Sequence, residues 1–317
     1  MPLGEFALID RYFSRSPRRR DVLLGVGDDA ALLQVPAGRA LVAATDTLVA
    51  GRHFLTSAPP ESIGHQALAV NLSDLAAMGA EPAWALLSLS MPEVQEAWLE
   101  RFAAGLHALA DRYAVDLVGG DTVRGPLVVT IELLGHVDPS RALRRSGARP
   151  GEFLYVSGWP GEAAAGLAAL ESGVPVTAQD PLVARHLYAE PRVALGQALL
   201  GRAGAAMDVS DGLLGDLARL CAASGAGARV DLERLPVSAE LTRRFEPPER
   251  ERFILQGGDD YELLFTLPAQ QAEAIEDTLS PICPVTCIGV IESQAGVRCT
   301  RNGVPTNLTG EGFDHFA

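Results

Sequence analysis

Apolar residues in the first half of the chain alternate between a strand-like and a helix-like arrangement. Short apolar runs predict strands, and the first two are expected to be short and buried. Helical spacing predicts two amphipathic helices, the first of which ends before Gly79, a candidate C-cap residue. The predicted strands are 22–26, 40–44, 83–91, 116–118 and 127–137, and the predicted helices are 61–78 and 93–113.

This pattern breaks at residues 138–151, where four arginines, two prolines and two glycines are typical of a linker. Beyond the break, strands are predicted at 153–157, 205–209, 228–232 and 262–267, with a closing strand pair. Helices are predicted at 162–171, 181–188, 192–200 and 213–223, with two more before residue 262. We therefore predict a mixed α/β protein with an N-terminal domain at 1–138, a linker at 139–150 and a C-terminal domain at 151–317.

Composition and charge narrow the class of protein. With 317 residues, of which 48% are hydrophobic, the chain is able to bury a substantial core. The net charge of -14 argues against nucleic acid and anionic membranes as partners, because both repel an acidic surface. No apolar stretch reaches the roughly 18 residues that span a bilayer. The four cysteines lack a second pair at metal-ligand spacing, so we interpret them as reduced thiols and expect a cytoplasmic protein.

The basic residues are all of one kind. All 26 are arginines, and the sequence contains no lysine. This excludes sites that need an ammonium group, namely a Walker A loop, the ATP-binding lysine of protein kinases and a lysine Schiff base. If the protein binds phosphates, arginines or metal ions must neutralise them.

Aspartates recur where predicted strands end or predicted helices begin, usually beside glycine or threonine. Asp74 instead lies within the helix 61–78, where it shares a face with Asn71. Mg²⁺ prefers hard oxygen ligands of this kind and often binds protein carboxylates and substrate phosphates at the same time. Aspartates gathered at one site would repel one another unless cations were bound among them. The sequence therefore predicts a phosphate-handling magnesium site, with the candidates Asp28, Asp29, Asp46, Asp74, Asp121, Asp208, Asp211, Asp259 and Asp260.

Each aspartate alone has a simpler interpretation. Asp211 suits a helix N-cap, the Gly-Asp pairs suit turns, and Asp74 suits a solvated helix face. The repetition of the pattern is what favours a metal site. A calcium-storage loop is excluded, because no Asp-x-Asp-x-Asp-Gly sequence that ends in glutamate is present.

Other polar residues suit phosphate binding. Arg141, Arg144 and Arg145 cluster near the predicted domain junction, and a guanidinium group binds phosphate oxygens well. A solvated linker is the simpler interpretation for the first two. His53 follows Asp46 by seven residues and is within reach of a substrate, although most of the six histidines are expected to be structural.

Seven motifs, in chain order, resemble those of the thiamine-monophosphate kinase family: GVGDDAALL, ATDTLVAGRHF, ALAVNLSDLAAMGAEP, GGDTVRGP, RSGARPGE, MDVSDGL and GGDDYELLFT. The resemblance runs from residues 4–6 to residues 312–316 and covers essentially the whole chain. This family belongs to the superfamily of aminoimidazole ribonucleotide synthetase and selenophosphate synthetase. The resemblance implies a two-domain PurM-like fold of the α/β (α+β) class. It further implies that the N-terminal α/β domain pairs its sheet with its twin in a homodimer and that a C-terminal α+β domain completes each active site.

The resemblance also implies a reaction, in which ATP and thiamine phosphate give ADP and thiamine diphosphate with several Mg²⁺ ions per site. By motif, the Mg²⁺ ligands are Asp29, Thr45, Asp46, Asp74, Asp121, Asp208 and Asp211, with Asp28 close by. The implied ATP contacts are Gly120, Asp121, Arg145 and Ser210, and the implied thiamine phosphate contacts are His53, Asp259 and Phe313. The chain departs from the family at two positions, with Asp259 in place of the usual glutamate and Ala44 in place of a frequent serine.

No residue is expected to act as a general acid or base. The attacking phosphate oxygen is already ionised at neutral pH, so we predict metal-assisted in-line transfer without a phosphoenzyme. One alternative is another reaction of the superfamily; selenophosphate synthesis lacks support because every cysteine lies at or beyond Cys221. Another is a metal-dependent phosphohydrolase, which predicts phosphate release without an acceptor. A third is a non-catalytic scaffold, which predicts ATP binding without turnover.

Overall fold

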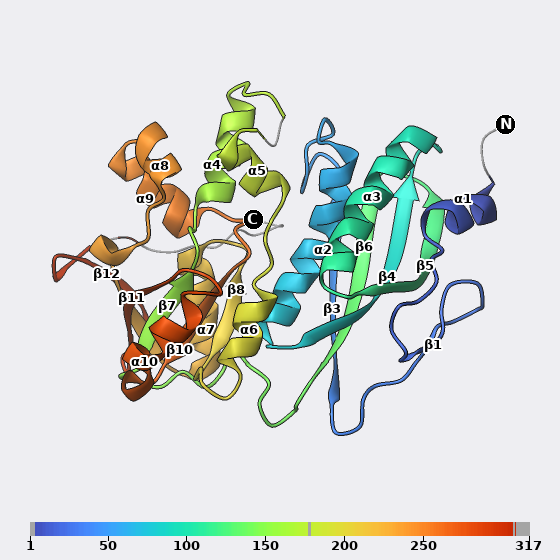
Figure 1. Ribbon diagram of the computed structural model, residues 1–317. Coiled ribbons are helices and arrows are strands. Elements are labelled where there is room, and N and C mark those ends of the chain that lie inside the picture. The colour runs from blue at the N-terminus through green and yellow to red at the C-terminus, as the bar shows by residue number, and fades with distance from the viewer. Residues whose placement is uncertain (1–3, 177–178, 307, 309–317) are drawn as a thin grey trace. The chain divides into compact units, whose positions relative to one another are not determined.

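The computed structural model describes residues 4–176, 179–306 and 308, with the backbone alone for 273–277 (Figure 1). The chain divides into two compact units. Unit 1 comprises Met1–Leu75 and Ala80–Ser140, and unit 2 comprises Ala76–Gly79 and Arg141–Ala317. Three of the four cysteines are buried, and none forms a disulfide. No helix among the described residues is long and apolar enough to span a membrane.

Unit 1 is built on a four-stranded sheet in the order β3-β6-β4-β5, in which only the β4–β5 pair is parallel. A separate two-stranded hairpin, β1–β2, precedes this sheet. In chain order the elements are α1 (Glu5–Tyr12), β1 (Val22–Leu24), β2 (Leu32–Leu33), β3 (Ala40–Val49), α2 (Pro60–Ala77), β4 (Glu81–Met91), α3 (Glu96–Arg112), β5 (Asp116–Arg124) and β6 (Val128–Val137). The predicted helices 61–78 and 93–113 and the predicted strands 83–91 and 127–137 are confirmed to within a few residues.

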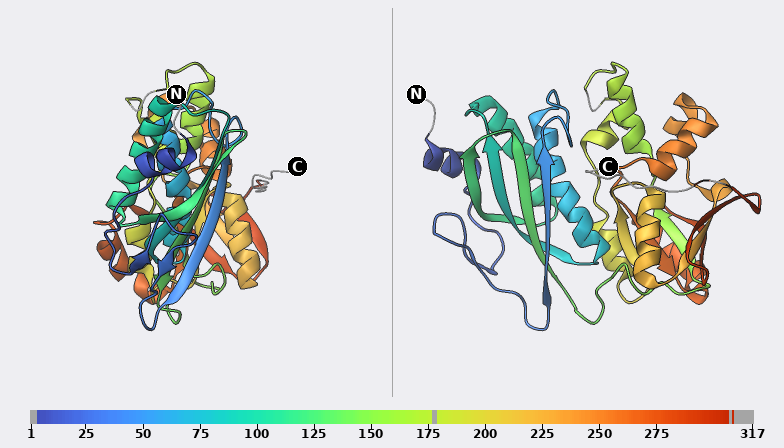
Figure 2. Two further views of the ribbon diagram at one scale, coloured as in Figure 1. Left: turned by 90° about the vertical axis from the view of Figure 1, so that its right-hand side faces the viewer. Right: turned by 180° about the vertical axis from the view of Figure 1, so that it is seen from behind.

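Helices α2 and α3 cover the same face of this sheet (Figures 1 and 2). They approach each other closely because glycines stand at the contact. A Cβ atom on Gly64 would lie 2.1 Å from the carbonyl oxygen of Phe102, and one on Gly105 would lie 1.9 Å from that of Glu61. The apolar stripe of α3 faces inward, so that Leu99, Phe102 and Leu106 are fully buried.

The opposite face of the sheet is covered in part by the segment that carries β1 and β2. Val22 and Leu33 from this segment pack on the buried residues Ala83, Trp84 and Val118 of β4 and β5. This small cluster anchors the segment beside the sheet.

Three strand predictions for unit 1 are wrong in extent or burial. Strand β1 has three residues that are half-buried or exposed, rather than the buried strand 22–26. Strand β3 alternates between half-buried and exposed residues and extends to Val49, because it is an edge strand and its threonines favour extended backbone. Strand β5 likewise extends to Arg124. Asp46 and Asp121 therefore lie inside strands and not at their ends.

Unit 2 is built on a seven-stranded sheet in the order β13-β12-β9-β11-β7-β10-β8. Only the β12–β9 pair is parallel. In chain order the elements are β7 (Phe153–Ser157), α4 (Glu162–Glu171), α5 (Pro181–Leu187), α6 (Val193–Leu199), β8 (Ala206–Val209), α7 (Leu213–Ser224), β9 (Gly227–Asp231), a 3-10 turn (Leu232–Arg234), α8 (Ala239–Arg244), α9 (Pro247–Gln256), β10 (Glu262–Leu267), α10 (Ala269–Leu279), β11 (Val285–Glu292), β12 (Gly296–Arg301) and β13 (Val304–Pro305).

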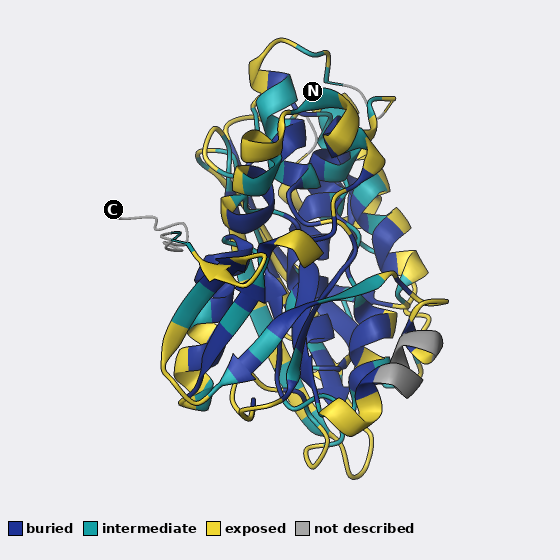
Figure 3. Ribbon diagram, turned by 90° about the vertical axis from the view of Figure 1, so that its left-hand side faces the viewer, coloured by how far each residue is buried: buried dark blue, intermediate teal, exposed yellow. Residues whose placement is uncertain are grey.

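The core of unit 2 lies between its sheet and helices such as α7, whose Leu213, Leu217 and Leu220 are fully buried. Figure 3 shows the central strands in the colour of buried residues, with exposed residues mainly on loops and outer helix faces. Where bounds were predicted, the strands and helices of this half are confirmed to within a few residues. The predicted closing strand pair corresponds to β11 and β12, which do not pair with each other because β9 lies between them. Helix α10 and strand β13 were not predicted, and neither were α1 and β2 in unit 1.

Candidate functional site

Unit 1 contains a cavity of about 980 Å³ that brings three of the predicted acidic residues together. Asp28 and Asp29 line it from the segment that carries β1 and β2, and Asp121 lines it from β5. Asp28 accepts a hydrogen bond from the backbone N–H of Asp29 at 2.8 Å, and all three aspartates are exposed. Part of the lining is apolar, including Leu86 of β4. The cavity therefore joins an acidic rim to an apolar wall.

The backbone at Gly120 sets the position of Asp121. Gly120 has a φ of 147°, and a Cβ atom there would lie 1.8 Å from the carbonyl oxygen of Leu87. Only glycine fits this conformation and this close approach to β4. Asp121 then pairs with Ser88 across the sheet, and both line the cavity.

The sheet register separates the predicted ligands of unit 1 into two groups. Asp46 pairs with Ile131, which is buried on the face that α2 and α3 cover. Thr45 pairs instead with Glu132, a residue that lines the cavity. Because alternate strand residues point to opposite faces, Thr45 shares the face of Asp121, and Asp46 points to the other face.

Helix α2 supplies Asp74 and Asn71 one turn apart. Asp74 is half-buried, whereas Asn71 is fully buried and donates from Nδ2 to the carbonyl oxygen of Ala67 at 3.0 Å. Its Oδ1 atom has no hydrogen-bond partner within the described part of the chain. An unpaired buried oxygen costs about 1–3 kcal/mol, and a bound cation or an ordered water would satisfy it. These hard oxygen donors suit Mg²⁺.

His53 lies in the turn that follows β3. Its Nδ1 atom accepts a hydrogen bond from the backbone N–H of Val49 at 3.0 Å, so the neutral ring carries its proton on Nε2. The side chain is half-buried. This bond fixes the orientation of the ring.

In unit 2, Asp208 is buried within β8, and Ser210 and Asp211 follow the strand directly. The backbone N–H groups of Ser210 and Asp211 both donate to Oδ2 of Asp216, each at 3.0 Å. Helix α7 begins after Gly212 without a side-chain cap, so the N-cap interpretation of Asp211 is wrong. The carboxylate of Asp211 instead pairs with Arg219 at 2.6 Å.

Asp216 organises this turn, and sequence reasoning missed it. It is almost fully buried, and burial raises its pKa, although hydrogen bonds from the Asp211 backbone and from Arg219 act in the opposite direction. Arg219 donates from one nitrogen to both Asp211 and Asp216. The sequence does contain a signal for this role of Asp216, which is an acidic residue in the first turn of the helix that follows the Asp-Val-Ser-Asp-Gly motif.

The segment 257–262 packs against the same turn. The N–H of Asp259 donates to the carbonyl oxygen of Ser210, and the N–H of Tyr261 donates to that of Val209, both at 2.9 Å. Asp259 and Tyr261 have φ values of 64° and 51°. A left-handed conformation costs a residue with a side chain roughly 1–2 kcal/mol. Unit 2 thus gathers Asp208, Ser210, Asp211 and Asp259 near one end of β8.

The arginines near the predicted linker differ in their contacts. Arg141 donates to the carbonyl oxygen of Leu200 at 2.8 Å, so it is not simply a solvated residue. Arg144 and Arg145 are exposed, and their carbonyl oxygens accept bonds from within unit 2. Among the described residues, the guanidinium group of Arg145 forms no hydrogen bond or ion pair. That group is therefore available to an anionic ligand.

The described structure does not test two parts of the predicted site, Phe313 and the bound metal ions. Phe313 lies outside the described residues. Within residues 4–176, 179–306 and 308, no three His, Cys, Asp or Glu side chains come close enough to hold a metal ion. The predicted ligands are divided between the two units, with five in unit 1 and two, Asp208 and Asp211, in unit 2.

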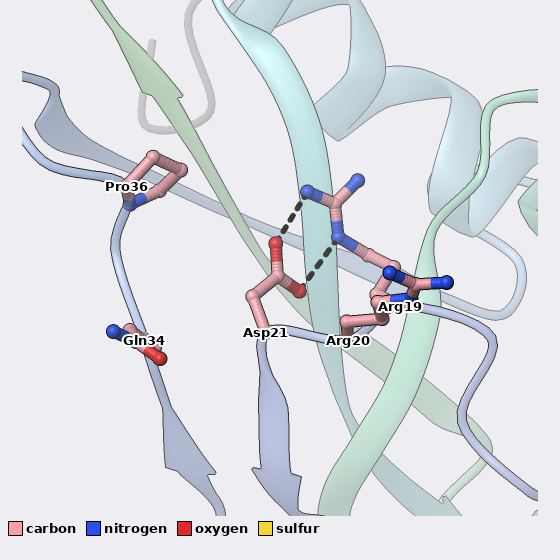
Figure 4. A pocket seen from close by; sticks show the side chains of 5 residues that line it. All are labelled: Arg19, Arg20, Asp21, Gln34 and Pro36. Atoms are coloured by element: carbon pink, nitrogen blue, oxygen red, sulfur yellow. Dashed lines mark hydrogen bonds and ion pairs between the residues drawn. The ribbon is translucent and has the colours of Figure 1, made fainter.

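A second cavity of unit 1, of about 460 Å³, contains none of the predicted site residues (Figure 4). Arg19 binds Asp21 there through two hydrogen bonds of 3.0 and 2.7 Å, and the indole N–H of Trp84 donates to Asp21 at 3.0 Å. Burial raises the pKa of the Asp21 carboxyl, but the bonds from Arg19 and Trp84 outweigh it and leave this pKa below its ordinary value. These contacts tie the start of β1 to β4, which is a structural role.

Comparison with known proteins shows which sequence families the chain matches. Residues 27–137 match the family model described as AIR synthase related protein, N-terminal domain, and residues 149–302 match its C-terminal counterpart. The thiamine-monophosphate kinase of Escherichia coli strain K12 is 49% identical to the chain over 323 residues, which cover 100% of this chain and 99% of that protein.

Solved structures agree in fold. The crystal structure of thiamine-monophosphate kinase from Stenotrophomonas maltophilia K279a superposes with a TM-score of 0.88 at 45% identity and covers 96% of this chain and 99% of that one. A structure described as AaThiL complexed with AMPPCP and TMP superposes with a TM-score of 0.77 at 33% identity and covers 89% of each chain. The predicted fold class, a two-domain mixed α/β fold of the PurM-like type, is confirmed.

Proposed function

This chain belongs to the thiamine-monophosphate kinase family, and we propose that it transfers the γ-phosphoryl group of ATP to thiamine phosphate, giving ADP and thiamine diphosphate. The observation that carries the proposal is similarity to these kinases over the full length of the chain. The relative complexed with AMPPCP and TMP supports ATP and thiamine phosphate as the two substrates. The acidic cavity of unit 1 and the acidic turn of unit 2 supply suitable chemistry.

Mg²⁺ is the proposed cofactor. Its ligands would come from Asp29, Thr45, Asp46, Asp74, Asp121, Asp208 and Asp211, with Asp28 close by. Each unit offers only a few hard oxygen donors, which suits a cation that keeps several waters and shares itself with substrate phosphates. When bound, Mg²⁺ would neutralise the charge on the phosphates. The chain has no lysine that could do so.

The residues of the chain are proposed to bind and orient the two substrates. Gly120 and Asp121, which both line the unit 1 cavity, would contact ATP there. Ser210 and the exposed Arg145 would do so from unit 2, and arginine suits phosphate oxygens. His53, Asp259 and Phe313 would contact thiamine phosphate.

The proposed mechanism is direct in-line transfer. The acceptor oxygen is ionised at neutral pH, so no side chain needs to remove a proton from it. The main tasks are to hold two anions together and in line, which is a matter of positioning. The hydrogen bond between Asp259 and Ser210 links a proposed acceptor contact to a proposed ATP contact. Asp259 is one methylene shorter than the glutamate usual in the family, so it reaches less far toward the acceptor.

We further propose that the chain forms a homodimer through the sheet of unit 1 and works in the cytoplasm. The exposed residues of β3, such as Thr45 and Thr47, leave part of this sheet open within the unit. None of the four cysteines forms a disulfide, which suits a reducing compartment.

An assay of thiamine diphosphate tests the proposed activity. The purified protein is incubated with ATP, MgCl₂ and thiamine phosphate, and the product is measured by fluorescence after oxidation to a thiochrome. Parallel samples lack the acceptor or contain EDTA. Product that needs all three components supports the kinase. ADP formed equally well without the acceptor would instead identify a phosphohydrolase.

A further inference from the structure

A cluster of charged side chains is buried next to the segment that carries Asp259. Glu262, at the start of β10, is fully buried and accepts hydrogen bonds from Ser157, Arg185 and Arg192. Arg192 binds both carboxylate oxygens, from Nε at 2.7 Å and from Nη2 at 2.6 Å. Charges enclosed in this way stabilise a fold no better than well-packed apolar side chains do. Their more specific effect is to fix the positions of the groups that they bind.

Arg185 connects this cluster to the backbone of the segment. Its Nη2 atom binds Glu262 and also donates to the carbonyl oxygen of Asp260 at 3.2 Å. The fully buried carboxyl group of Asp260, whose pKa burial raises well above its ordinary value, accepts the N–H of Gly161 at 2.7 Å and that of Ala163 at 3.3 Å, at the start of α4. Asp260 is therefore held at both its carbonyl group and its side chain.

The segment needs such restraints because its backbone is strained. Asp259 and Tyr261 both adopt left-handed φ values, which residues with side chains keep only when the surroundings impose them. Through their N–H groups they bind Ser210 and Val209. These two bonds hold the segment on one side, at the turn that follows β8, and Arg185 and Glu262 hold it on the other.

The cluster stays charged at neutral pH. Burial raises the pKa of the Glu262 carboxyl, but hydrogen bonds and charge from Arg192 and Arg185 outweigh it and bring this pKa below its ordinary value. The restraint is therefore ionic, and loss of one arginine leaves the other to balance the carboxylate.

We propose that Arg185 and Arg192 are positioning residues, which act through Glu262 to hold residues 259–262 so that Asp259 is placed to contact the acceptor. This inference rests on the proposed function and adds two residues to it. Both arginines act through their bonds to Glu262 and to the backbone of the segment, and neither is a direct ligand of ATP or thiamine phosphate. Their loss should weaken acceptor binding more than ATP binding.

The test compares three variants by steady-state kinetics and thermal unfolding. Arg185→Gln removes the bonds to Glu262 and to the Asp260 carbonyl, and it should raise the KM for thiamine phosphate by about tenfold or more, with the KM for ATP changed by less than about threefold. Arg192→Lys keeps the charge without the bidentate geometry and should give an intermediate increase. It also serves as the test if the first variant fails to fold.

Arg298→Gln is the matched control. Arg298 of β12 binds Glu292 of β11 in unit 2 through two bonds of 3.0 and 2.6 Å, and neither residue belongs to the segment 257–262 or to β10. Both KM values should stay within about twofold of those of the unmodified protein. A rise in both KM values that merely follows the loss of thermal stability in all three variants would overturn the positioning role.

Hydrogen exchange separates this inference from the proposed function. Without substrates, a peptide that spans residues 257–263 should exchange faster in Arg185→Gln and unchanged in Arg298→Gln. If the unmodified protein forms no thiamine diphosphate, the proposed function fails, while this exchange still decides whether the arginines hold the segment. Unchanged exchange together with an unchanged KM for thiamine phosphate in a folded Arg185→Gln variant would contradict the inference.

Discussion

The position of Asp121 depends on the glycine before it. Gly120 combines a φ of 147° with contact between backbones, so a side chain there meets both a strained conformation and the carbonyl oxygen of Leu87. The sequence shows a Gly-Gly-Asp motif that is equally typical of an ordinary turn. The distinction depends on the pairing of β4 with β5, which is not a local property.

Gly120→Ala should therefore destabilise the protein more than a left-handed φ alone would. Gly38→Ala is the control, because Gly38 has a φ of 76° and no atom within 4 Å of an added Cβ. We expect a cost of about 1 kcal/mol for the control and at least about 2 kcal/mol for Gly120→Ala, measured by urea unfolding. Equal costs would show that the contact with Leu87 is not tight.

The ion pair of Asp21 makes a pH-dependent contribution to stability. Its folded-state pKa lies below the unfolded value, so its contribution is present above the unfolded pKa and is lost as the pH falls through the folded one. Asp21→Asn should cost about 1–2 kcal/mol near pH 7, and the difference from the unmodified protein should shrink near pH 3. Urea unfolding at both pH values measures it. A difference that grows in acid would contradict the assigned direction.

Among the elements, those with strong periodicity could be predicted from the sequence. Helix α3 places apolar residues on one face over its whole length, and its predicted bounds differ from the observed Glu96–Arg112 by a few residues at most. The apolar run 40–44 predicts a short buried strand that ends before Asp46, but β3 continues through Thr45, Asp46 and Thr47. An edge strand tolerates exposed polar residues, and its pairing with β6 continues to Val49. That pairing cannot be read from local sequence.

The contact between α2 and α3 reverses the usual effect of replacing a helical glycine. Alanine normally favours a helix over glycine by about 1 kcal/mol. At Gly64, however, an added Cβ would lie 2.1 Å from the carbonyl oxygen of Phe102 and would force the two helices apart. Gly64→Ala should lower the free energy of unfolding by about 2 kcal/mol or more. An unchanged or higher unfolding midpoint would show that the helices can separate without cost.

For the whole molecule, the sequence could predict the acidic motifs and the reaction class but not how the acids group in space. Asp46 and Asp121 are equivalent in sequence as aspartates beside threonines after apolar runs, yet the sheet register places them on opposite faces. Asp216 escaped notice because its role, to accept two backbone N–H groups, becomes visible only in the folded turn. Resemblance to a family supplied the roles that spacing alone could not assign.

The proposed metal ligands make a prediction for both units. Asp46→Asn in unit 1 and Asp211→Asn in unit 2 should each lower kcat by about a hundredfold or more at fixed Mg²⁺, because each removes an oxygen ligand and its charge. Asp10→Asn is the control, since Asp10 is exposed on α1 and is not a proposed ligand. Its kcat should stay within about twofold of that of the unmodified protein. The metal assignment fails if the first two variants keep full activity across a titration with MgCl₂.

In the proposed reaction, the γ-phosphoryl group of ATP moves to the phosphate of the acceptor. The most direct measurement uses ATP labelled at the γ-phosphorus, together with thiamine phosphate and MgCl₂, and separates the products by chromatography. We expect the label to appear in thiamine diphosphate and this transfer to stop when EDTA is added. Label found in free phosphate alone, at the same rate with and without the acceptor, would contradict it.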